Sequence, residues 1–279
     1  MTLHQLVKNV ENLFSVPEVY FRVKKMVDLP ATTVADIAKV ISEEPGLAAR
    51  VLKIANSAFF GFATKIETLD RAINIMGLAH LQNILLVVSV SKSFKGVRSE
   101  LIDIKKFWMH SIYCAVIARI LARRCKILDD ERLFVCGILH DIGHLVIYSA
   151  LPSHATEVIF RAHSEQRPLY LVEKEMYGFD YAEVGGELLK QWLLPESLYL
   201  VVRQHIHFPL VQQYQLDSAI INLANSIALR KEQQETGLFV KEIDLLALQL
   251  VGITEAELDE VKVEAEANML EILNALFGI

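Results

Sequence analysis

The sequence contains few residues that break helices, with 12 glycines and 7 prolines among 279 residues. Hydrophobic residues make up 53% of the chain, enough to bury a large core, which excludes a disordered protein. No alternating strand pattern competes with the helical periodicity. The sequence therefore predicts an all-α globular protein.

The sequence also leads us to expect no disulfides, no signal peptide and no membrane-spanning segment. The three cysteines, Cys114, Cys125 and Cys136, are an odd number without C-x-x-C spacing, which argues against a disulfide framework and a cysteine zinc site. The opening MTLHQLVKNVENLF lacks the apolar segment of a signal peptide, and no run approaches the ~20 apolar residues that cross a bilayer. We expect a cytoplasmic protein with reduced thiols and no membrane partner.

A clustered basic face is absent as well. The net charge is -6 and the isoelectric point about 5.9, with charges of both signs spread along the chain. Three short basic pairs are interpreted as solvated helix faces: Lys24 with Lys25, Lys105 with Lys106, and Arg123 with Arg124. Because nucleic-acid binding needs a concentrated basic surface, we expect no nucleic-acid partner.

The polar stretch over 95–104 contains a glycine and interrupts the apolar pattern, which indicates a joint. A second polar break, KEQQETG, begins at Lys231. These breaks predict an N-terminal helical lobe over 1–97, a helical core over 98–231 and a C-terminal extension over 232–279. The apolar face of the extension must be covered, either by packing back as a cap or in a homodimer.

Helix boundaries are marked by capping patterns. Thr33 with Asp36, and Asp180 with Glu183, have the spacing of capping boxes at the start of amphipathic helices. The sequence also predicts one long helix over 104–126, followed by a single apolar helix with an acidic start that contains the stretch GILHDIGHL at 137–145.

The His140-Asp141 doublet lies within that apolar helix. A neutral imidazole and a carboxylate are both metal ligands, so the doublet indicates a metal corner. Successive helical residues point about 100° apart, so further ligands must come from other helices. The candidates are polar residues on apolar helices: His110, His144, Tyr181, His205, His207 and Asn225. Taken singly, each histidine is more readily interpreted as a hydrogen-bonded core or surface residue than as a ligand, whereas together they favour a metal site.

Several motifs in order resemble the HDOD family, a bacterial branch of the HD superfamily of metal-dependent phosphohydrolases. They are ISEEPGLAARVLKIANSAFFG, IETLDRAINIMGL, the W-x-H-S motif at Trp108, LFVCGILHDIGH and WLLPESLYLVVRQH. The resemblance covers about residues 14–230 and implies an HD-like multi-helix bundle with an N-terminal helical lobe.

The resemblance also implies a set of metal ligands. The first histidine of catalytic HD proteins matches His110, their doublet matches His140 and Asp141, and their later aspartate matches Asn225. An amide is neutral, so this site would hold a divalent ion more weakly. We expect a single ion, with Fe, Mn, Mg, Zn and Ni left undistinguished, and Asp141 is the candidate catalytic residue.

Ligands for the second metal of dinuclear HD-GYP relatives are mostly missing. Their positions correspond to Tyr181, His205 and Ile206, and His207 is one residue out of register. His205, His144 and His207 remain additional candidates. The GYP signature is absent, which argues against hydrolysis of cyclic dinucleotides.

Three functional hypotheses follow from the resemblance. The favoured one is a non-catalytic regulatory or scaffold module in bacterial signalling, which would act through protein partners. The alternative is a metal-dependent phosphohydrolase that uses His110, His140 and Asp141 on a phosphoester or nucleotide. The third is a sensor that binds a nucleotide or a metal without turnover.

Overall fold

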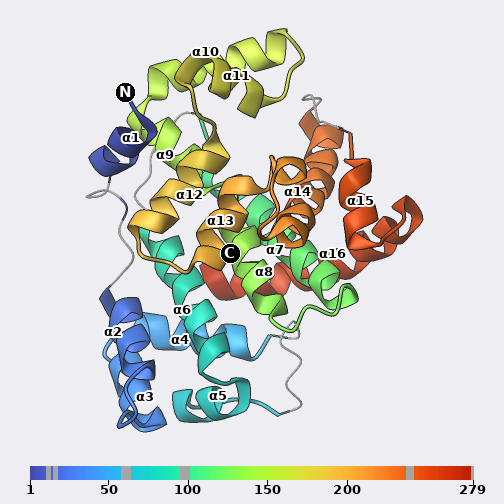
Figure 1. The fold of residues 1–279 in the computed structure, drawn as a ribbon. Helices are drawn as coiled ribbons and strands as arrows, with labels where there is room; N and C mark the ends of the chain where they lie inside the picture. The colour runs from blue at the N-terminus through green and yellow to red at the C-terminus, as the bar shows by residue number, and fades with distance from the viewer. Residues whose placement is uncertain (11–13, 15–17, 58–63, 95–100, 237–241, 278–279) are drawn as a thin grey trace. The chain divides into compact units, whose positions relative to one another are not determined.

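The computed structural model describes residues 1–10, 14, 18–57, 64–94, 101–236 and 242–277. Every regular element in this part of the chain is a helix, which confirms the all-α prediction (Figure 1). The chain divides into two compact units, a large unit of Met1–Leu13 with Val97–Glu266 and a small unit of Phe14–Gly96 with Ala267–Ile279. The three-part division at 97 and 231 stays a prediction, and residues 95–100 of the expected joint lie outside the described residues.

The small unit follows the capping and turn signals of its sequence. Thr33 and Asp36 form the predicted capping box, and Gly77, with φ +84°, turns the chain between two helices. The helices are α2 (Glu18–Val27), α3 (Val34–Ser42), α4 (Pro45–Ala55), α5 (Leu69–Met76) and α6 (Leu78–Ser93), with the end of α16 (Glu255–Phe277) from Ala267 onward.

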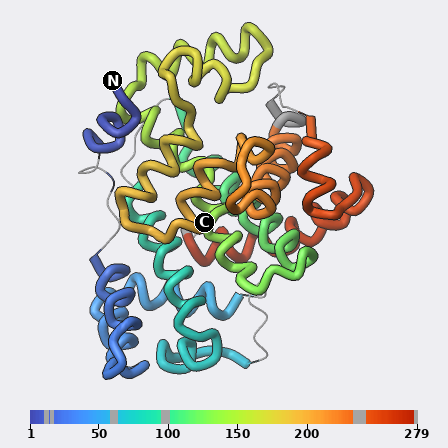
Figure 2. The backbone as a smooth tube through the Cα atoms, viewed as in Figure 1, coloured from blue at the N-terminus to red at the C-terminus, as the bar shows by residue number. Residues whose placement is uncertain are grey.

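The large unit is built around α7 (Ile104–Arg124), which is buried along most of its length and packs against α8 and α14. Figure 2 traces the chain through its remaining helices. They are α1 (Leu3–Val10), α8 (Asp130–Leu139), α9 (Ile142–Ala150), α10 (Pro152–Ser164), α11 (Leu169–Tyr177), α12 (Tyr181–Gln191), α13 (Glu196–Gln204), the 3-10 turn η1 (Phe208–Leu210), α14 (Gln215–Thr236), α15 (Leu245–Val251) and α16 up to Glu266.

The prediction of a single apolar helix around the His-Asp doublet is wrong in one respect. The structure divides it into α8 and α9, and the break falls at His140 and Asp141. Asp141 has φ -99° and ψ 5°, which leaves the α-helical conformation, and Gly143 then brings α9 against the backbone of Tyr181 in α12. The doublet therefore lies at a helix junction.

The segment Asp130–Ala150, which contains this junction, is long and apolar enough to cross a membrane, so the expectation that no run approaches that length is wrong. Its most apolar window is 83% buried inside the fold, as expected for a core segment. In the small unit, α5 and α6 meet the same criterion only when counted together, although they are bent by 120°.

The hairpin of α10 and α11 has a small core of its own, in which Val158, Ala162 and Val172 are buried against Leu169 and Met176. Figure 1 shows the hairpin at one end of the large unit, beyond α9 and α12. It supplies one wall of the cavity described below.

Candidate metal centre

Three of the predicted ligands meet in the interior of the large unit, and we call them the triad: His110 from α7, and His140 and Asp141 from the α8–α9 junction. Each offers a ligand atom within 4.8 Å of the others, and all three side chains are buried. Close packing of α7 on α8 makes this possible, because a side chain at Gly137 would collide with the backbone of Ala115.

The spacing of the triad fits a metal ion. His110 Nε2 lies 3.3 Å from His140 Nε2 and 3.3 Å from Asp141 Oδ2, and His140 Nε2 lies 3.2 Å from Asp141 Oδ1. Ligand bonds of about 2.1 Å at tetrahedral angles place neighbouring ligand atoms about 3.4 Å apart. The side chains therefore match a metal corner without rearrangement.

Hydrogen bonds orient both imidazoles toward the same point. His140 Nδ1 donates to the carbonyl of Gly137 at 2.7 Å, and His110 Nδ1 donates to Glu232 Oε1 at 2.8 Å. Because these partners act as acceptors, each neutral ring keeps its proton on Nδ1 and presents the lone pair of Nε2 to the triad. Two facing lone pairs beside a carboxylate are best satisfied by a cation.

The protonation preferences of the triad also favour positive charge at this point. Burial lowers the pKa of His110, but when a proton rather than an ion occupies Nε2, hydrogen bonds to Asp141 and Glu232 outweigh burial and raise the pKa to about 10. Burial likewise opposes the charge of His140, yet Asp141 raises its pKa well above the usual value. Burial raises the pKa of Asp141, while the two histidines bring it well below the ordinary range.

Glu232 is a site residue that the sequence reasoning missed. It lies seven residues after Asn225 on α14, two helical turns along the same face, which is the signal that could have identified it. The carboxylate holds the His110 ring from the side opposite the triad, as acidic partners of metal-binding histidines commonly do.

We expect Glu232→Ala to weaken Mn²⁺ binding by about 10- to 100-fold, because His110 would lose the acceptor that fixes its ring. Isothermal titration with Mn²⁺ measures the effect. Glu157→Ala, at an exposed position on α10, is the control and should leave affinity unchanged. Unchanged affinity in Glu232→Ala would refute the role of Glu232 in orienting His110 toward the ion.

Asn225 lies on α14 and lines the same cavity as Asp141. Its Nδ2 donates to the hydroxyl of Tyr181 at 3.5 Å, and its buried Oδ1 has no hydrogen-bond partner among the described residues. A buried amide oxygen without a partner is a candidate ligand atom. Its role as fourth ligand stays a prediction.

Tyr181 and His205 fill the space next to the triad. The Tyr181 hydroxyl lies 3.3 Å from His205 Nε2, and the His205 ring centroid lies 5.4 Å from that of His140. His205 Nδ1 donates to the carbonyl of Val202, so its Nε2 accepts from the tyrosine. Burial lowers the pKa of His205 to about 4, and its ring stays neutral.

His144 stacks on Tyr181 with ring centroids 3.9 Å apart, and its Nδ1 lies 3.6 Å from Glu173 Oε1. Burial lowers the pKa of His144 to about 4. Glu173 on α11, also missed from the sequence, is 1% exposed and accepts the backbone N–H of Tyr181 at 2.9 Å. Burial raises the pKa of Glu173 well above the usual value.

His207 is engaged away from the triad. Its Nε2 pairs with Asp180 Oδ2 at 2.8 Å, beside the predicted capping box of Asp180 and Glu183, and its side chain is 33% exposed. The structure thus brings His110, His140 and Asp141 together, and places Asn225, His144 and His205 around them.

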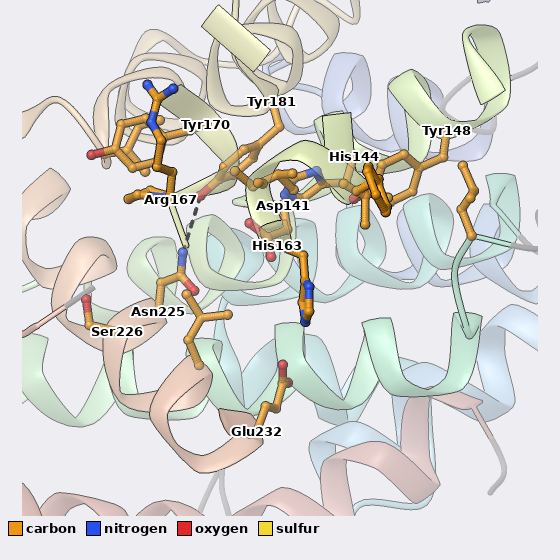
Figure 3. A pocket seen from close by; sticks show the side chains of 18 of the residues that line it. Asp141, His144, Tyr148, His163, Arg167, Tyr170, Tyr181, Asn225, Ser226 and Glu232 are labelled. Carbon is orange, nitrogen blue, oxygen red and sulfur yellow. Dashed lines mark hydrogen bonds between the residues drawn. The ribbon is translucent and has the colours of Figure 1, made fainter. Parts of the chain in front are cut away.

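A cavity of about 680 Å³ opens beside the triad, a volume typical of ligand-binding sites. In Figure 3, Asp141 and His144 lie near Tyr181, which a hydrogen bond joins to Asn225. Arg167 and Tyr170 lie beyond Tyr181, and Glu232 lies on the α14 side.

Solved structures resemble the whole chain. A protein of Shewanella amazonensis SB2B, provisionally named a phosphohydrolase, is 26% identical with a TM-score of 0.77 and coverage of 97% of each chain. An HDOD domain protein of unknown function from Geobacter sulfurreducens is 21% identical with a TM-score of 0.76, covering 99% of this chain and 98% of its own. A Marinobacter aquaeolei VT8 protein, provisionally named a signal transduction protein, is 19% identical with a TM-score of 0.72. The match covers 98% of this chain and 64% of the Marinobacter chain.

An uncharacterized protein of Treponema pallidum (strain Nichols) is 26% identical over 204 residues, which cover 72% of this chain. The match spans only 39% of the length of that relative.

The helical bundle and the buried His, His-Asp triad define a domain of the HD type. The family model of the HDOD domain matches residues 13–208, and the chain belongs to the HDOD domain family.

Proposed function

We propose that this chain is a regulatory HDOD module of a bacterial signalling pathway, which holds one divalent ion and does not turn over a substrate. The observation that carries the metal-binding part is the pair of opposed Nε2 atoms in His110 and His140, both with Nδ1 already donating. We propose protein partners and a phosphoester or nucleotide ligand in the cytoplasm, and that a homodimer can form.

Departures from the ligand set of catalytic HD proteins support binding without turnover. Asp141 is the single carboxylate of the triad, and Asn225, at the position of the fourth ligand, is neutral. A catalytic ion would have to be held firmly enough to lower the pKa of a bound water and polarise a phosphoryl oxygen, and a neutral fourth ligand would weaken its binding. Tyr181, in contact with His205, occupies the region where the resemblance expects a second metal ligand.

A phosphohydrolase remains the second candidate because of one observation. Asp141 lines the cavity, and its buried Oδ1, although 3.2 Å from His140 Nε2, makes no hydrogen bond within the described residues. In that function Asp141 would accept a proton from the attacking water.

Elemental analysis and a phosphodiesterase assay on the purified protein distinguish the two functions. We expect about one equivalent of metal after loading with Mn²⁺ and no release of 4-nitrophenol from bis(4-nitrophenyl) phosphate. Turnover that disappears in His140→Ala would replace the regulatory proposal with the hydrolase. Failure to retain any metal would refute both.

We expect Asn225→Asp to tighten Mn²⁺ binding. A full charge at 4 Å is worth about 4 kcal/mol at an effective dielectric of 20, and the cost of burying the carboxylate offsets much of this. A net gain of about 10- to 100-fold in affinity is expected, as measured by isothermal titration. Asn9→Asp, on the exposed surface of α1, is the control. Unchanged affinity in Asn225→Asp would remove residue 225 from the ligand set.

A further inference from the structure

The α10–α11 hairpin gives the cavity an apolar wall. Ile159 and Phe160 from α10, and Leu169 and Tyr170 from α11, line it. Phe160 is 73% exposed, an uncommon state for a phenylalanine beside a cavity. A ligand that covered this ring would remove apolar surface from water, so the wall suits a flat apolar body.

One face of α14 gives the cavity a polar wall. Asn222, Asn225 and Ser226 are spaced at i, i+3 and i+4, so they share a helix face, and all three line the cavity. Two amides and a hydroxyl supply both donors and acceptors without charge. The buried, unpartnered Oδ1 of Asn225 shows that this wall is incompletely satisfied within the described residues.

The charges of the cavity are uneven. Asp141 and Glu232 make its triad end acidic, and Arg167 is the only permanently cationic side chain among the described residues that line it. Arg167 is already paired with Glu165 and Glu175. An anion therefore enters favourably only after a cation has bound the triad, where three protein ligands leave coordination positions for an oxygen.

We propose that the cavity binds a flat ring that carries one oxyanion group. The oxyanion lies toward Asp141, and the ring lies between the hairpin and the α14 face, with Asn222 hydrogen-bonded to a polar atom of the ring. The inference rests on the proposed metal site and narrows its proposed phosphoester or nucleotide ligand to one that carries a flat ring bound between these two walls. Binding of the ring-bearing anion is coupled to binding of the ion, since each balances the charge of the other.

Three probes test the parts of this proposal by isothermal titration of the Mn²⁺-loaded protein. 4-Methylumbelliferyl phosphate has a ring with a carbonyl acceptor, 1-naphthyl phosphate has a ring without one, and inorganic phosphate has no ring. We expect both ring phosphates to bind at least about tenfold tighter than inorganic phosphate, as stacked rings typically do. In EDTA, binding of the ring phosphates should weaken by at least about tenfold.

Two variants assign the walls. Phe160→Ala should weaken binding of both ring phosphates by about tenfold, whereas Leu128→Ala, at a fully exposed leucine outside the cavity, should not. Because Asn222 would donate a hydrogen bond to the coumarin carbonyl, the unmodified protein should bind 4-methylumbelliferyl phosphate more tightly than 1-naphthyl phosphate, and Asn222→Leu should abolish this difference. Circular dichroism and the Mn²⁺ affinity of each variant show that its fold and triad are intact.

The outcomes separate this inference from the proposed function. If Mn²⁺ binds but the ring phosphates bind no tighter than inorganic phosphate, the ligand class is wrong and the metal site stands. If the ring phosphates bind equally well in EDTA, the coupling is wrong. If Mn²⁺ does not bind, the proposed function fails and the inference fails with it. Release of 4-methylumbelliferone with cavity-dependent binding would support the ligand class and overturn the absence of turnover.

Discussion

His140→Ala is expected to abolish metal binding and the rise in melting temperature that metal produces. A ligand at about 100 times its dissociation constant stabilises a protein by about 2.7 kcal/mol, which is about 5–10 °C for a unit of this size. Without the His140 imidazole, two triad ligands remain, His110 and Asp141, and even with the neutral amide of Asn225 they are too weak a set to retain the ion. Elemental analysis and differential scanning calorimetry, with and without Mn²⁺, measure both effects.

The metal-free protein provides the reference for this measurement, because removing a buried imidazole lowers stability even without metal. Only the difference between the loaded and metal-free states reports the site. His154→Ala, on the exposed side of α10, is the matched control and should keep the full metal-dependent rise. An undiminished rise in His140→Ala would place the ion elsewhere on the molecule.

Helices were predictable where local signals dominate. The capping boxes of Thr33 and Asp180 join residues only three positions apart, and the turn between α5 and α6 depends on a single glycine. Such local signals can be located from the sequence alone. The break at His140 and Asp141 was not predictable in this way. It depends on the contact between Gly143 and the α12 backbone, which lies about forty residues further along the chain.

The site residues also divide into those that the sequence identifies and those that only tertiary contacts reveal. His110, His140 and Asp141 were identified through motifs, and the structure brings them together. Glu232 and Glu173 were missed because an acidic residue in a helix is usually a solvated one, and neither sequence context distinguishes them. Only their tertiary contacts distinguish them. Glu232 accepts a hydrogen bond from the His110 ring, and Glu173 accepts one from the buried backbone N–H of Tyr181.

Three polar side chains around the triad are uncharged, which determines how much of the charge of a bound ion its surroundings balance. Tyr181, Asn225 and Glu173 stand around the triad without adding fixed negative charge, since burial raises the pKa values of both Tyr181 and Glu173. A divalent ion at the triad would therefore be only partly balanced by its own ligands, of which Asp141 alone is charged, while the Glu232 carboxylate lies across the His110 ring. This residual positive charge is the physical reason to expect an anionic ligand in the adjoining cavity.

Gly143→Ala is expected to be the most destabilising single change near the site. A Cβ atom at this position would collide with the backbone carbonyl of Tyr181 and approach the backbone nitrogen of Gly185. Backbone atoms cannot swing aside as side chains do, so α9 and α12 must separate. We expect the free energy of unfolding to fall by about 3 kcal/mol or more, which is a drop of about 6–12 °C in melting temperature.

Gly46→Ala is the control, because a Cβ at this helical position in α4 meets no atom within 4 Å. It should leave stability unchanged or raise it by about 0.5–1 kcal/mol, since alanine favours the helix. Mn²⁺ affinity should fall in Gly143→Ala even where the protein remains folded, because Asp141 lies two residues before the displaced position. A wild-type melting temperature and affinity in Gly143→Ala would contradict the close α9–α12 contact that positions the triad.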